Sequence, residues 1–582
     1  MADESNPKSP KPSGDKPEMS MEKRMLIAFG LMGLVLFGTQ FFMPKAPKPA
    51  ADKTPAPVAS QSAPATPQPA APKPAQPSPA VPSPAGQTKA AAAPAAAPAV
   101  SAAKEELLTV ETDVYRIVFS NKGAVVRSWV LKKYKDGSGQ PVELASASAA
   151  PKAGWPFAFV FPREKPGVEL NGVLFSASQP DPLTVEFTYG DGKVSARKSF
   201  RFEAKGYRSD LRSEVTKEGR GVDHQLSWRG GFGDRTVHKE SDNQKSVYYD
   251  GSRQKLVEEG KGFADKGPMT VAGPYHFAGI EDTFFAGVVL PKAGSPIEFV
   301  TWSDVLRTTK DGEETAHVGV SFGGGAVIDA GLFIGPKDTD ILRATDRKLE
   351  TMIDWGWFWF IAKPLFLSLH WVDENITHNW GWAIVLATVV INLLMLPLRF
   401  SQLKSSQKMA VIQPELQAIQ AKYKGMSMKD PRKQKQNEEM MALYQKHGIN
   451  PMGGCVPLLL QMPFFIAFFK VLSVAIELRG AQWLWVTDLS QPETLPIRLL
   501  PVGMLVSQVL MQKMTPAASP DPAQQRLMMI MMPVMLTVMF YGASSGLVLY
   551  WLTGNVVGIA QQFFFNKAVA TPAPAQPTAK KK

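Results

Sequence analysis

The sequence has few cysteines and histidines and none of the common motifs of metal centres or nucleotide sites. Its 582 residues include one cysteine, Cys455, so an intrachain disulfide is excluded. Its seven histidines show no metal-ligand spacing, and the chain has no Walker A loop. We therefore expect no metal and no cofactor.

Catalytic motifs are equally scarce. The pattern G-x-S-x-G occurs at residues 319–323 and 542–546. A nucleophile elbow stands between a strand and a helix, whereas the first copy lies in a β-rich stretch and the second in a turn between apolar segments. We expect neither serine to be catalytic, and we predict that the protein is not an enzyme.

The chain also lacks the basic residues interleaved with aromatics that would stack on nucleic acid, although its formal net charge is +12. Its lysines and arginines cluster beside long apolar segments instead. Basic residues mark the cytoplasmic ends of membrane helices, so this distribution indicates a membrane protein.

The N-terminal part consists of three segments that differ in amino-acid composition. Residues 1–24 are polar and basic, and they predict a cytoplasmic tail. Residues 25–43 are apolar and predict a first transmembrane helix; a cleaved signal peptide is the alternative, disfavoured by the length of the run and the large residues at its end. Residues 44–103 are dominated by alanine and proline, which predicts an extended linker.

Residues 104–345 consist of short β-rich runs without a long helical period. In residues 183–202, apolar alternation runs into a Gly-Asp-Gly turn and back, which predicts a hairpin. Residues 114–131, 297–302 and 317–322 repeat the alternation. We predict an all-β, sandwich-like domain that lies beyond the first span, in a periplasm.

Residues 350–372 are apolar but do not resemble a span. Lys363 and Pro364 interrupt them, and Gly356, Lys363 and His370 recur every seven residues as a polar stripe. This pattern predicts an amphipathic helix in the membrane interface, with its tryptophans at headgroup level.

The rest of the chain alternates apolar and basic segments. Residues 399–455 carry ten Lys/Arg and four Asp/Glu, so we place this loop in the cytoplasm. The spacing of Met409, Ile412 and Leu416 predicts a helical hairpin in it. Its basic residues set topology or dock to a ribosome, RNA or anionic lipid.

The remaining predicted segments are transmembrane helices at 380–398, 455–476, 499–514, 527–541 and 545–565, a cytoplasmic hairpin at 399–454, a periplasmic loop at 477–498, a cytoplasmic loop at 515–526 and a basic cytoplasmic tail at 566–582.

Polar residues inside these spans are the candidate site. Thr388 and Asn392 are four residues apart, so they share one helical face. They form either a simple interhelix hydrogen bond or the wall of a polar cavity. Polar groups on several other spans favour a hydrated cavity inside the bundle; they are Gln461, Lys470, Ser507, Gln508, Gln512 and Asn555.

Several ordered motifs then resemble the YidC membrane-protein insertases, relatives of the mitochondrial and chloroplast insertases. The most specific is NPMGGCVPLLLQMP at residues 450–463. Others are NWG at 379–381, LPL at 396–398, MMALY at 440–444, IELR at 476–479, QKM at 512–514, DPAQQ at 521–525 and SGLVLY at 545–550. The match is dense over residues 350–567, and the layout of the N-terminal part resembles the Gram-negative members.

The resemblance implies a multi-domain fold: a polytopic bundle of six transmembrane helices, five of which form the insertase core, plus the periplasmic β domain. It implies a chaperone that receives hydrophilic segments of nascent inner-membrane proteins in a polar groove, alone or with the Sec translocon. It also implies contacts with lipids and, through the hairpin and basic tail, with the ribosome and signal-recognition components. Thr388 matches a substrate-contacting position, and Trp551 matches an aromatic position opposite it.

The sequence departs from the family at one place. Many bacterial members carry a basic residue five positions before the proline of the second span, where this chain has Asn392. A neutral amide interacts only at contact, so electrostatic capture at this position is in doubt. We hypothesise that Lys470 supplies the charge; the alternative is that Lys470 snorkels out of the bundle.

Two other classes of function stay open at this point. A transporter needs a through-path and usually shows inverted repeats, which we do not find. An enzyme anchored by its spans would use the β domain to bind a glycan or another ligand.

Overall fold

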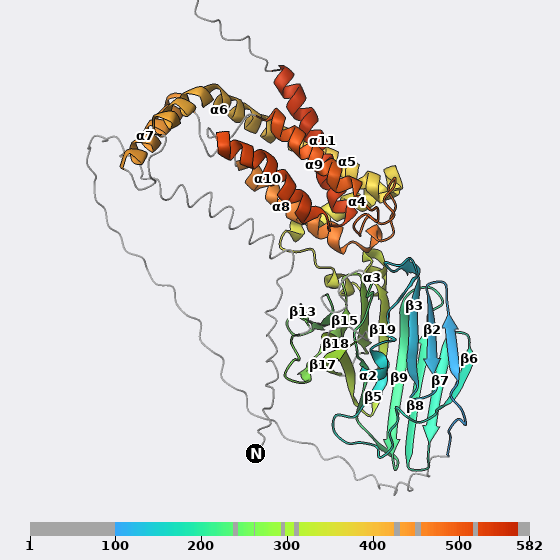
Figure 1. Cartoon of the computed structure of the whole chain (residues 1–582). Helices are drawn as coiled ribbons and strands as arrows, with labels where there is room; N and C mark the ends of the chain where they lie inside the picture. Colours follow the sequence, from blue (N-terminus) through green and yellow to red (C-terminus); the bar gives the residue numbers. More distant parts are fainter. Residues whose placement is uncertain are drawn as a thin grey trace, which may run out of the picture. The chain divides into compact units, whose positions relative to one another are not determined.

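The computed structural model describes residues 99–236, 243–260, 262–292, 297–307, 314–423, 431–448, 456–515 and 522–568. The predicted first span, most of the linker, the predicted N-terminal tail and all but residues 566–568 of the predicted C-terminal tail lie outside these residues. The described chain divides into β-rich and helical parts (Figure 1).

The β-rich part contains three antiparallel sheets. The first has the order β1-β2-β3-β4, the second β13-β12-β15-β16-β19-β9-β8-β7-β6 with β10 beside β9, and the third β14-β17-β18-β11-β5. Short helices α2 (Ala150–Ala153) and α3 (Thr339–Thr345) accompany them. The strands are β1 Leu107–Glu111, β2 Tyr115–Ser120, β3 Val125–Lys135, β4 Pro141–Glu143, β5 Ala158–Val160, β6 Ser176–Asp181, β7 Thr184–Gly190, β8 Val194–Phe202, β9 Arg208–Lys217, β10 Arg220–Gly221, β11 His224–Trp228, β12 Lys245–Asp250, β13 Lys255–Gly260, β14 Met269–Ala272, β15 Tyr275–Glu281, β16 Phe285–Pro291, β17 Glu298–Arg307, β18 Glu314–Gly325 and β19 Val327–Pro336.

The hairpins predicted from alternation are confirmed. β7 pairs with β8, β2 with β3, and β17 with β18. In the β7–β8 turn the Asp191 carboxylate accepts the backbone N–H groups of Lys193 and Val194, and Gly192 has φ 89°. Local turn chemistry therefore sets the register of this hairpin.

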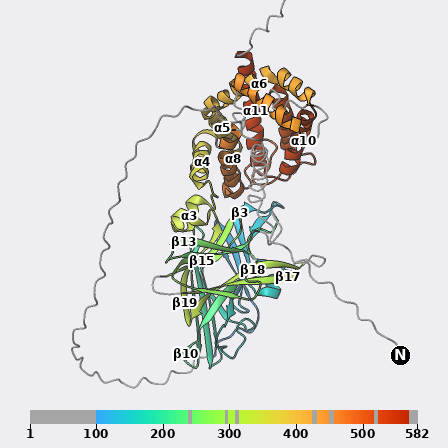
Figure 2. The same cartoon turned by 90° about the vertical axis from the view of Figure 1, so that its left-hand side faces the viewer.

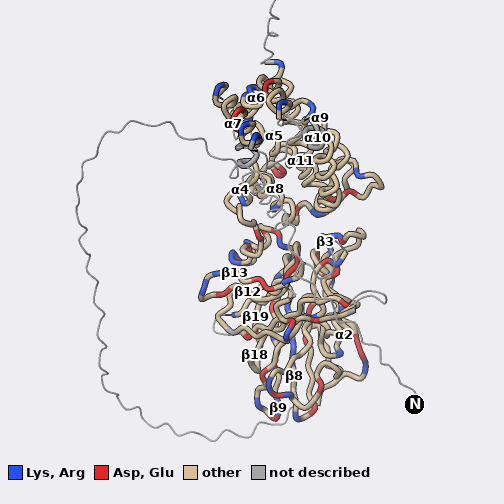
Figure 3. The backbone as a smooth tube through the Cα atoms, turned by 60° about the vertical axis from the view of Figure 1, so that its left-hand side comes forward, with Lys and Arg blue, Asp and Glu red and all other residues tan. Residues whose placement is uncertain are grey.

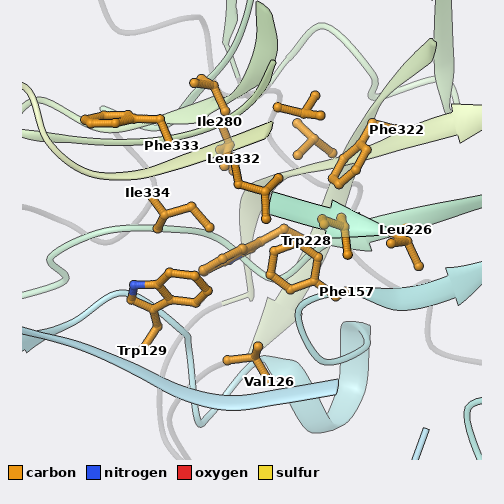
Figure 4. Close-up of a cluster of buried hydrophobic side chains, with 14 of the residues drawn as sticks. Val126, Trp129, Phe157, Leu226, Trp228, Ile280, Phe322, Leu332, Phe333 and Ile334 are labelled. Atoms are coloured by element: carbon orange, nitrogen blue, oxygen red, sulfur yellow. The ribbon is translucent and has the colours of Figure 1, made fainter. Parts of the chain in front are cut away.

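One hydrophobic core joins the three sheets. The rings of Trp129 from β3, Phe157 and Trp228 from β11 lie against one another, with centroids 5.9–6.4 Å apart. Leu332 and Phe333 from β19 belong to the same buried cluster (Figure 4). The sheets are therefore layers of one domain and not separate folding units.

The β8 strand places a lysine in this core. Its inward positions include Lys198, which is fully buried. The ammonium group donates to the backbone oxygens of Ala124 and Phe157 at 2.9 and 2.7 Å, and it lies 3.8 Å from the Phe159 ring centroid. Burial lowers the pKa of Lys198 well below its usual value.

The helical part follows η1, a 3-10 turn at Leu349–Met352. Its helices are α4 Trp359–Val372, the π-turn η2 Asp373–Thr377, α5 Trp380–Leu394, α6 Leu396–Lys422, α7 Pro431–Lys446, α8 Val456–Val474, the 3-10 turn η4 Ile476–Leu478, α9 Leu499–Met514, α10 Pro522–Phe540 and α11 Ser545–Ala568. α11 packs against α5, α8 and α9, and α4 packs against α5 and α8 (Figure 2).

Several helix boundaries differ from the sequence prediction; for example, α10 begins at Pro522, before the predicted span 527–541, and α11 continues to Ala568, beyond the predicted span 545–565. The amphipathic helix predicted from residue 350 begins at Trp359, because Gly356 takes φ 71° in a turn closed by the Asp354 carboxylate. The predicted span 380–398 is divided at Met395 between α5 and α6. Backbone hydrogen bonds still continue across Met395, from its N–H to Ile391 and from the Arg399 N–H to Met395.

Helix length alone does not establish six spans. Among the described helices, Ser545–Lys567 is long and apolar enough to cross a membrane by itself. Trp359–Thr377 and Trp380–Leu394 pass the same test together, but they meet at a bend of 115°. The shorter apolar helices are Gln461–Val474, Leu499–Met514 and Met529–Phe540.

Residues 407–448, as far as they are described, belong to a separate compact unit. Ile412 and Leu416 of α6 form a small core with Leu443 of α7. Glu439 accepts a hydrogen bond from the Tyr423 hydroxyl at 2.8 Å. The apolar spacing predicted for a helical hairpin therefore does bring the two helices into contact.

Lysines and arginines are frequent along α6 and α7, whereas α10 and α11 carry few charges (Figure 3).

The segment after α8 contacts the β-rich domain. The Arg479 guanidinium forms an ion pair with Asp234, and each side chain is 3% exposed. Arg479 also donates to the Lys135 backbone oxygen, at 2.7 Å from Nη2. Burial raises the pKa of the adjacent Glu477 to about 7, and Asp338 and Asp340 add to this effect.

Candidate functional site

The candidate site lies where α5, α9 and α11 meet. Asn555 of α11 donates to the Ser507 hydroxyl of α9 at 3.0 Å, and both side chains are buried. Gln561 of α11 donates to the backbone oxygen of Asn392 of α5 at 3.2 Å. Polar groups predicted on separate spans therefore meet inside the helical part.

Thr388 and Asn392 share one face of α5, as their spacing predicts. The Thr388 hydroxyl is fully buried and donates to the Ile384 backbone oxygen at 2.6 Å. The Asn392 amide donates to the Thr388 backbone oxygen at 2.8 Å. Both side chains thus donate to backbone oxygens of their own helix. The side-chain oxygen of Asn392 can accept a hydrogen bond from another group.

Several buried amide oxygens near this junction have no hydrogen-bond partner among the described residues. They are the side-chain oxygens of Gln508 and Gln512 on α9 and of Gln561 on α11. A buried polar atom without a partner costs about 1–3 kcal/mol, so such atoms concentrate where a polar ligand or water is expected. The junction therefore combines interhelix hydrogen bonds with unused acceptors.

The other predicted site residues lie elsewhere. Gln461 of α8 is exposed. Trp551 packs edge-on against Phe465, with centroids 5.0 Å apart, and against Phe540 at 5.1 Å. Its placement opposite Thr388 stays a prediction that these contacts do not support.

Lys470 is also outside this junction. Its ammonium group is 2.6 Å from the Asp354 carboxylate, which precedes α4. This carboxylate neutralises the lysine near the end of α8, whereas the hypothesis requires a charge beside Asn392. The contact therefore does not support Lys470 as the substitute cation.

Sequence reasoning overlooked Arg399. It follows the predicted second span, and we counted it only among the basic residues of the loop. Its guanidinium Nη2 lies 3.6 Å from the Met511 sulfur of α9. Its spacing of seven residues from Asn392 is the signal that could have placed it on the same helical face.

The outer faces of α9 and α10 are apolar and exposed. On α9 they include Val502, Val506 and Leu510. On α10 they comprise Ile530, Met531, Met532, Val534, Met535, Val538 and Met539. An apolar surface of this extent suits contact with hydrocarbon or with another apolar segment.

Gly381 fixes the start of α5 against the loop that follows α8. A Cβ atom at this position would lie 2.2 Å from Cδ1 and 2.5 Å from Cβ of Trp483. We expect Gly381→Ala to lower the free energy of unfolding by about 1–3 kcal/mol, because Trp483 must move. Denaturant unfolding of the full chain in detergent, followed by tryptophan emission, measures this loss.

Gly554→Ala is the matched control for Gly381→Ala, because no heavy atom lies within 4 Å of a Cβ at Gly554. Its unfolding midpoint should stay unchanged or rise, since alanine favours a helix over glycine. Equal midpoints for the two variants would show that the Trp483 contact does not restrict Gly381.

Comparisons with known families cover both parts of the chain. A family model described as 60Kd inner membrane protein matches residues 371–572, and one described as YidC periplasmic domain matches residues 107–368.

Relatives of similar length carry the name Membrane protein insertase YidC. The one from Geobacter sulfurreducens is 34% identical over 485 residues, covering 79% of this chain and 86% of the relative. The one from Citrifermentans bemidjiense is 34% identical over 577 residues, covering 94% of this chain and 100% of the relative. A solved structure described as an active YidC insertase with the first transmembrane domain resolved is 19% identical, covers 80% of this chain and 93% of that chain, and has a TM-score of 0.35.

Proposed function

Because this chain belongs to the YidC family of membrane-protein insertases, we propose that the junction of α5, α9 and α11 is where it receives the hydrophilic segment of a nascent membrane protein. The protein is an inner-membrane insertase with a periplasmic β-rich domain, and it is not an enzyme. The proposal concerns how its own residues perform the insertion.

The observation that carries the proposal is the set of buried polar groups on three different helices. Ser507 with Asn555, and Asn392 with Gln561, are paired across helices. Within the part of the chain that the structure describes, the amide oxygens of Gln508, Gln512 and Gln561 have no hydrogen-bond partner. Polar groups in a bilayer are costly, so unused acceptors lower the barrier for a polar segment that must leave water. Insertion of this kind needs no chemical reaction.

The topology that fits this role has six spans with both termini in the cytoplasm. α5, α8, α9, α10 and α11 would be the five core spans, and residues 25–43 would be the sixth. In this arrangement α4 lies in the periplasmic interface, and the α6–α7 hairpin faces the cytoplasm. The basic loop and tail would then contact ribosomes, signal-recognition components and anionic lipids, and the Sec translocon would share some substrates.

Depletion of this protein should leave small membrane proteins uninserted. We expect the tails of newly made single- and double-span proteins to stay in the cytoplasm and to resist protease added outside, because these tails can then no longer cross through the junction of α5, α9 and α11. The measurement is pulse labelling followed by protease treatment of spheroplasts. Normal cleavage of the tails in depleted cells that have no second homologue would refute the proposal.

Recovery of ribosome–nascent-chain complexes provides the second measurement. The full chain should recover complexes that expose an apolar segment, and it should not recover complexes that expose only a soluble segment. Equal recovery of both would indicate simple adhesion of the basic loop to ribosomes.

A further inference from the structure

The end of α8 and the turn that follows it are fixed to the β-rich domain; residues 474–479 are called the α8 anchor below. Ile476 is 1% exposed and belongs to the hydrophobic core that joins the three sheets, and Val474 packs against that core. Arg479 forms the buried ion pair with Asp234 and donates to the Lys135 backbone oxygen. An apolar contact and an ion pair therefore hold the α8 anchor against one domain.

Glu477 lies between these two contacts and faces carboxylates of the β-rich domain. Burial raises its pKa to about 7, and Asp338 and Asp340 at the start of α3 add to the rise. A hydrogen bond from the Thr339 backbone N–H partly offsets it. Tyr134 of β3 is also close, because Glu477 contributes to raising the pKa of the Tyr134 hydroxyl. The cation of the same segment, Arg479, pairs with Asp234 instead.

His370 of α4 faces the same acidic group from the other side. Its Nε2 atom is 3.5 Å from the Asp340 carboxylate and 3.1 Å from the Glu374 carboxylate, and Asp373 also lies near it. The imidazole attracts these carboxylates only when it carries a proton. Protonation of His370 and protonation of Glu477 therefore change the contact in the same direction, since both reduce its net negative charge.

Ionisation of Glu477 places three carboxylates together. Two of them, Asp338 and Asp340, belong to the β-rich domain, whereas Glu477 belongs to the α8 anchor. Like charges in a partly buried contact repel one another and are poorly screened by solvent. The repulsion therefore acts between α3 and the α8 anchor, and separation of the two returns Glu477 to water.

We propose that the α8 anchor is a proton-controlled clamp: it holds the β-rich domain while Glu477 is protonated, and it loosens when Glu477 is ionised. The β-rich domain is periplasmic, so the clamp responds to the pH outside the inner membrane. This inference concerns the contact between the β-rich domain and α8, and it does not depend on where a substrate segment binds.

Rising pH should separate this contact. The pKa of Glu477 is about 7 in the docked state, and it returns to the ordinary value of 4.5 when the side chain is exposed. Between these values the docked state keeps a proton that the separated state releases, so docking is strongest below about pH 4.5 and weakens as the pH rises through 7. From pH 5.5 to pH 8.5 the ratio of separated to docked protein should rise about thirtyfold.

The experiment measures opening by labelling a buried thiol at position 476 with N-ethylmaleimide. The full chain in detergent carries Ile476→Cys, which also weakens the apolar contact, and Cys455→Ser, which removes the native thiol. Each rate is divided by that of Thr487→Cys, an exposed reference in the same background, because the thiolate fraction itself changes with pH. We expect the normalised rate to rise about thirtyfold from pH 5.5 to pH 8.5.

Three variants in this background test the assignment. Glu477→Gln should hold the normalised rate within about twofold over the same range, because its side chain does not ionise. Asp340→Asn should show a smaller rise than the parent protein, since one facing negative charge is gone. Glu169→Gln is the matched control at an exposed carboxylate, and it should keep the full rise.

Asp234→Asn checks that labelling reports this contact. It breaks the ion pair with Arg479, so it should speed labelling at both pH values. Unchanged labelling would show that this pair does not close the contact, which would overturn the clamp. A normalised rate that is independent of pH in the parent protein, or a full rise in Glu477→Gln, would overturn it as well. If His370→Gln abolishes the rise and Glu477→Gln does not, the histidine is the proton sensor and the inference is wrong.

Discussion

Arg479→Ala is expected to lower the free energy of unfolding by about 3–5 kcal/mol, because it leaves the Asp234 carboxylate buried without its partner. The variant also loses the hydrogen bonds to the Lys135 backbone oxygen. Denaturant unfolding of the full chain in detergent measures the effect. Arg479→Lys should recover little of it, since one ammonium group cannot reproduce the two-sided contact of a guanidinium.

Arg163→Ala is the control, because Arg163 pairs with Asp223 and Glu298 but its side chain is 55% exposed. An exposed pair contributes about 0–1 kcal/mol. Asp234→Ala combined with Arg479→Ala should be less damaging than the arginine change alone, since no unpaired charge is left. If Arg163→Ala and Arg479→Ala lowered the free energy of unfolding by similar amounts, burial of the Arg479–Asp234 pair would not explain its effect on stability.

The stability of the protein is expected to fall by about 3 kcal/mol from Glu477 alone as the pH rises from about 4.5 to above 7. Burial, with Asp338 and Asp340, raises the pKa of Glu477 in the folded protein to about 7, from 4.5. Between these values the folded state keeps a proton that the unfolded state has released, so stability decreases with rising pH. Below pH 4.5 both states are protonated and the contribution is complete.

Glu477→Gln should remove this dependence and raise the unfolding midpoint at pH 8. The measurement is the difference between wild type and variant at each pH, because burial also raises the pKa of Glu281 to about 7. Glu169→Gln, at an exposed carboxylate, is the matched control. If the stabilities of Glu477→Gln and wild type changed with pH in the same way, Glu477 would not titrate in this range.

The sequence predicted the features that local patterns determine. Alternation about the Gly-Asp-Gly turn identified the β7–β8 hairpin, because the period of side chains in a strand is two residues. The order of the three sheets was not predictable in this way. The Arg479–Asp234 contact joins residues 245 positions apart, and no local pattern reports such a pairing.

The candidate site was predictable only as a set of polar residues on apolar helices. The sequence named Ser507 and Asn555, but the rotation of α9 and α11 about their axes decides that these two meet. Lys470 was also predicted as a site residue, but it forms an ion pair with Asp354, which lies in a segment that we predicted to be helical. Arg399 was missed because an arginine after a span normally marks topology, whereas here α9 and α11 enclose it.

Under the proposed function, the exposed face of α10 has a consequence for substrate range. Four of the residues on this face are methionines, Met531, Met532, Met535 and Met539. Methionine is unbranched and polarizable, so it changes rotamer at little cost and fits apolar partners of different shape. An insertase meets a different sequence in each client, and a face of branched residues would suit some of them and exclude others. Clients that pass along α10 in the proposed arrangement would meet a face whose side chains can change rotamer for each of them.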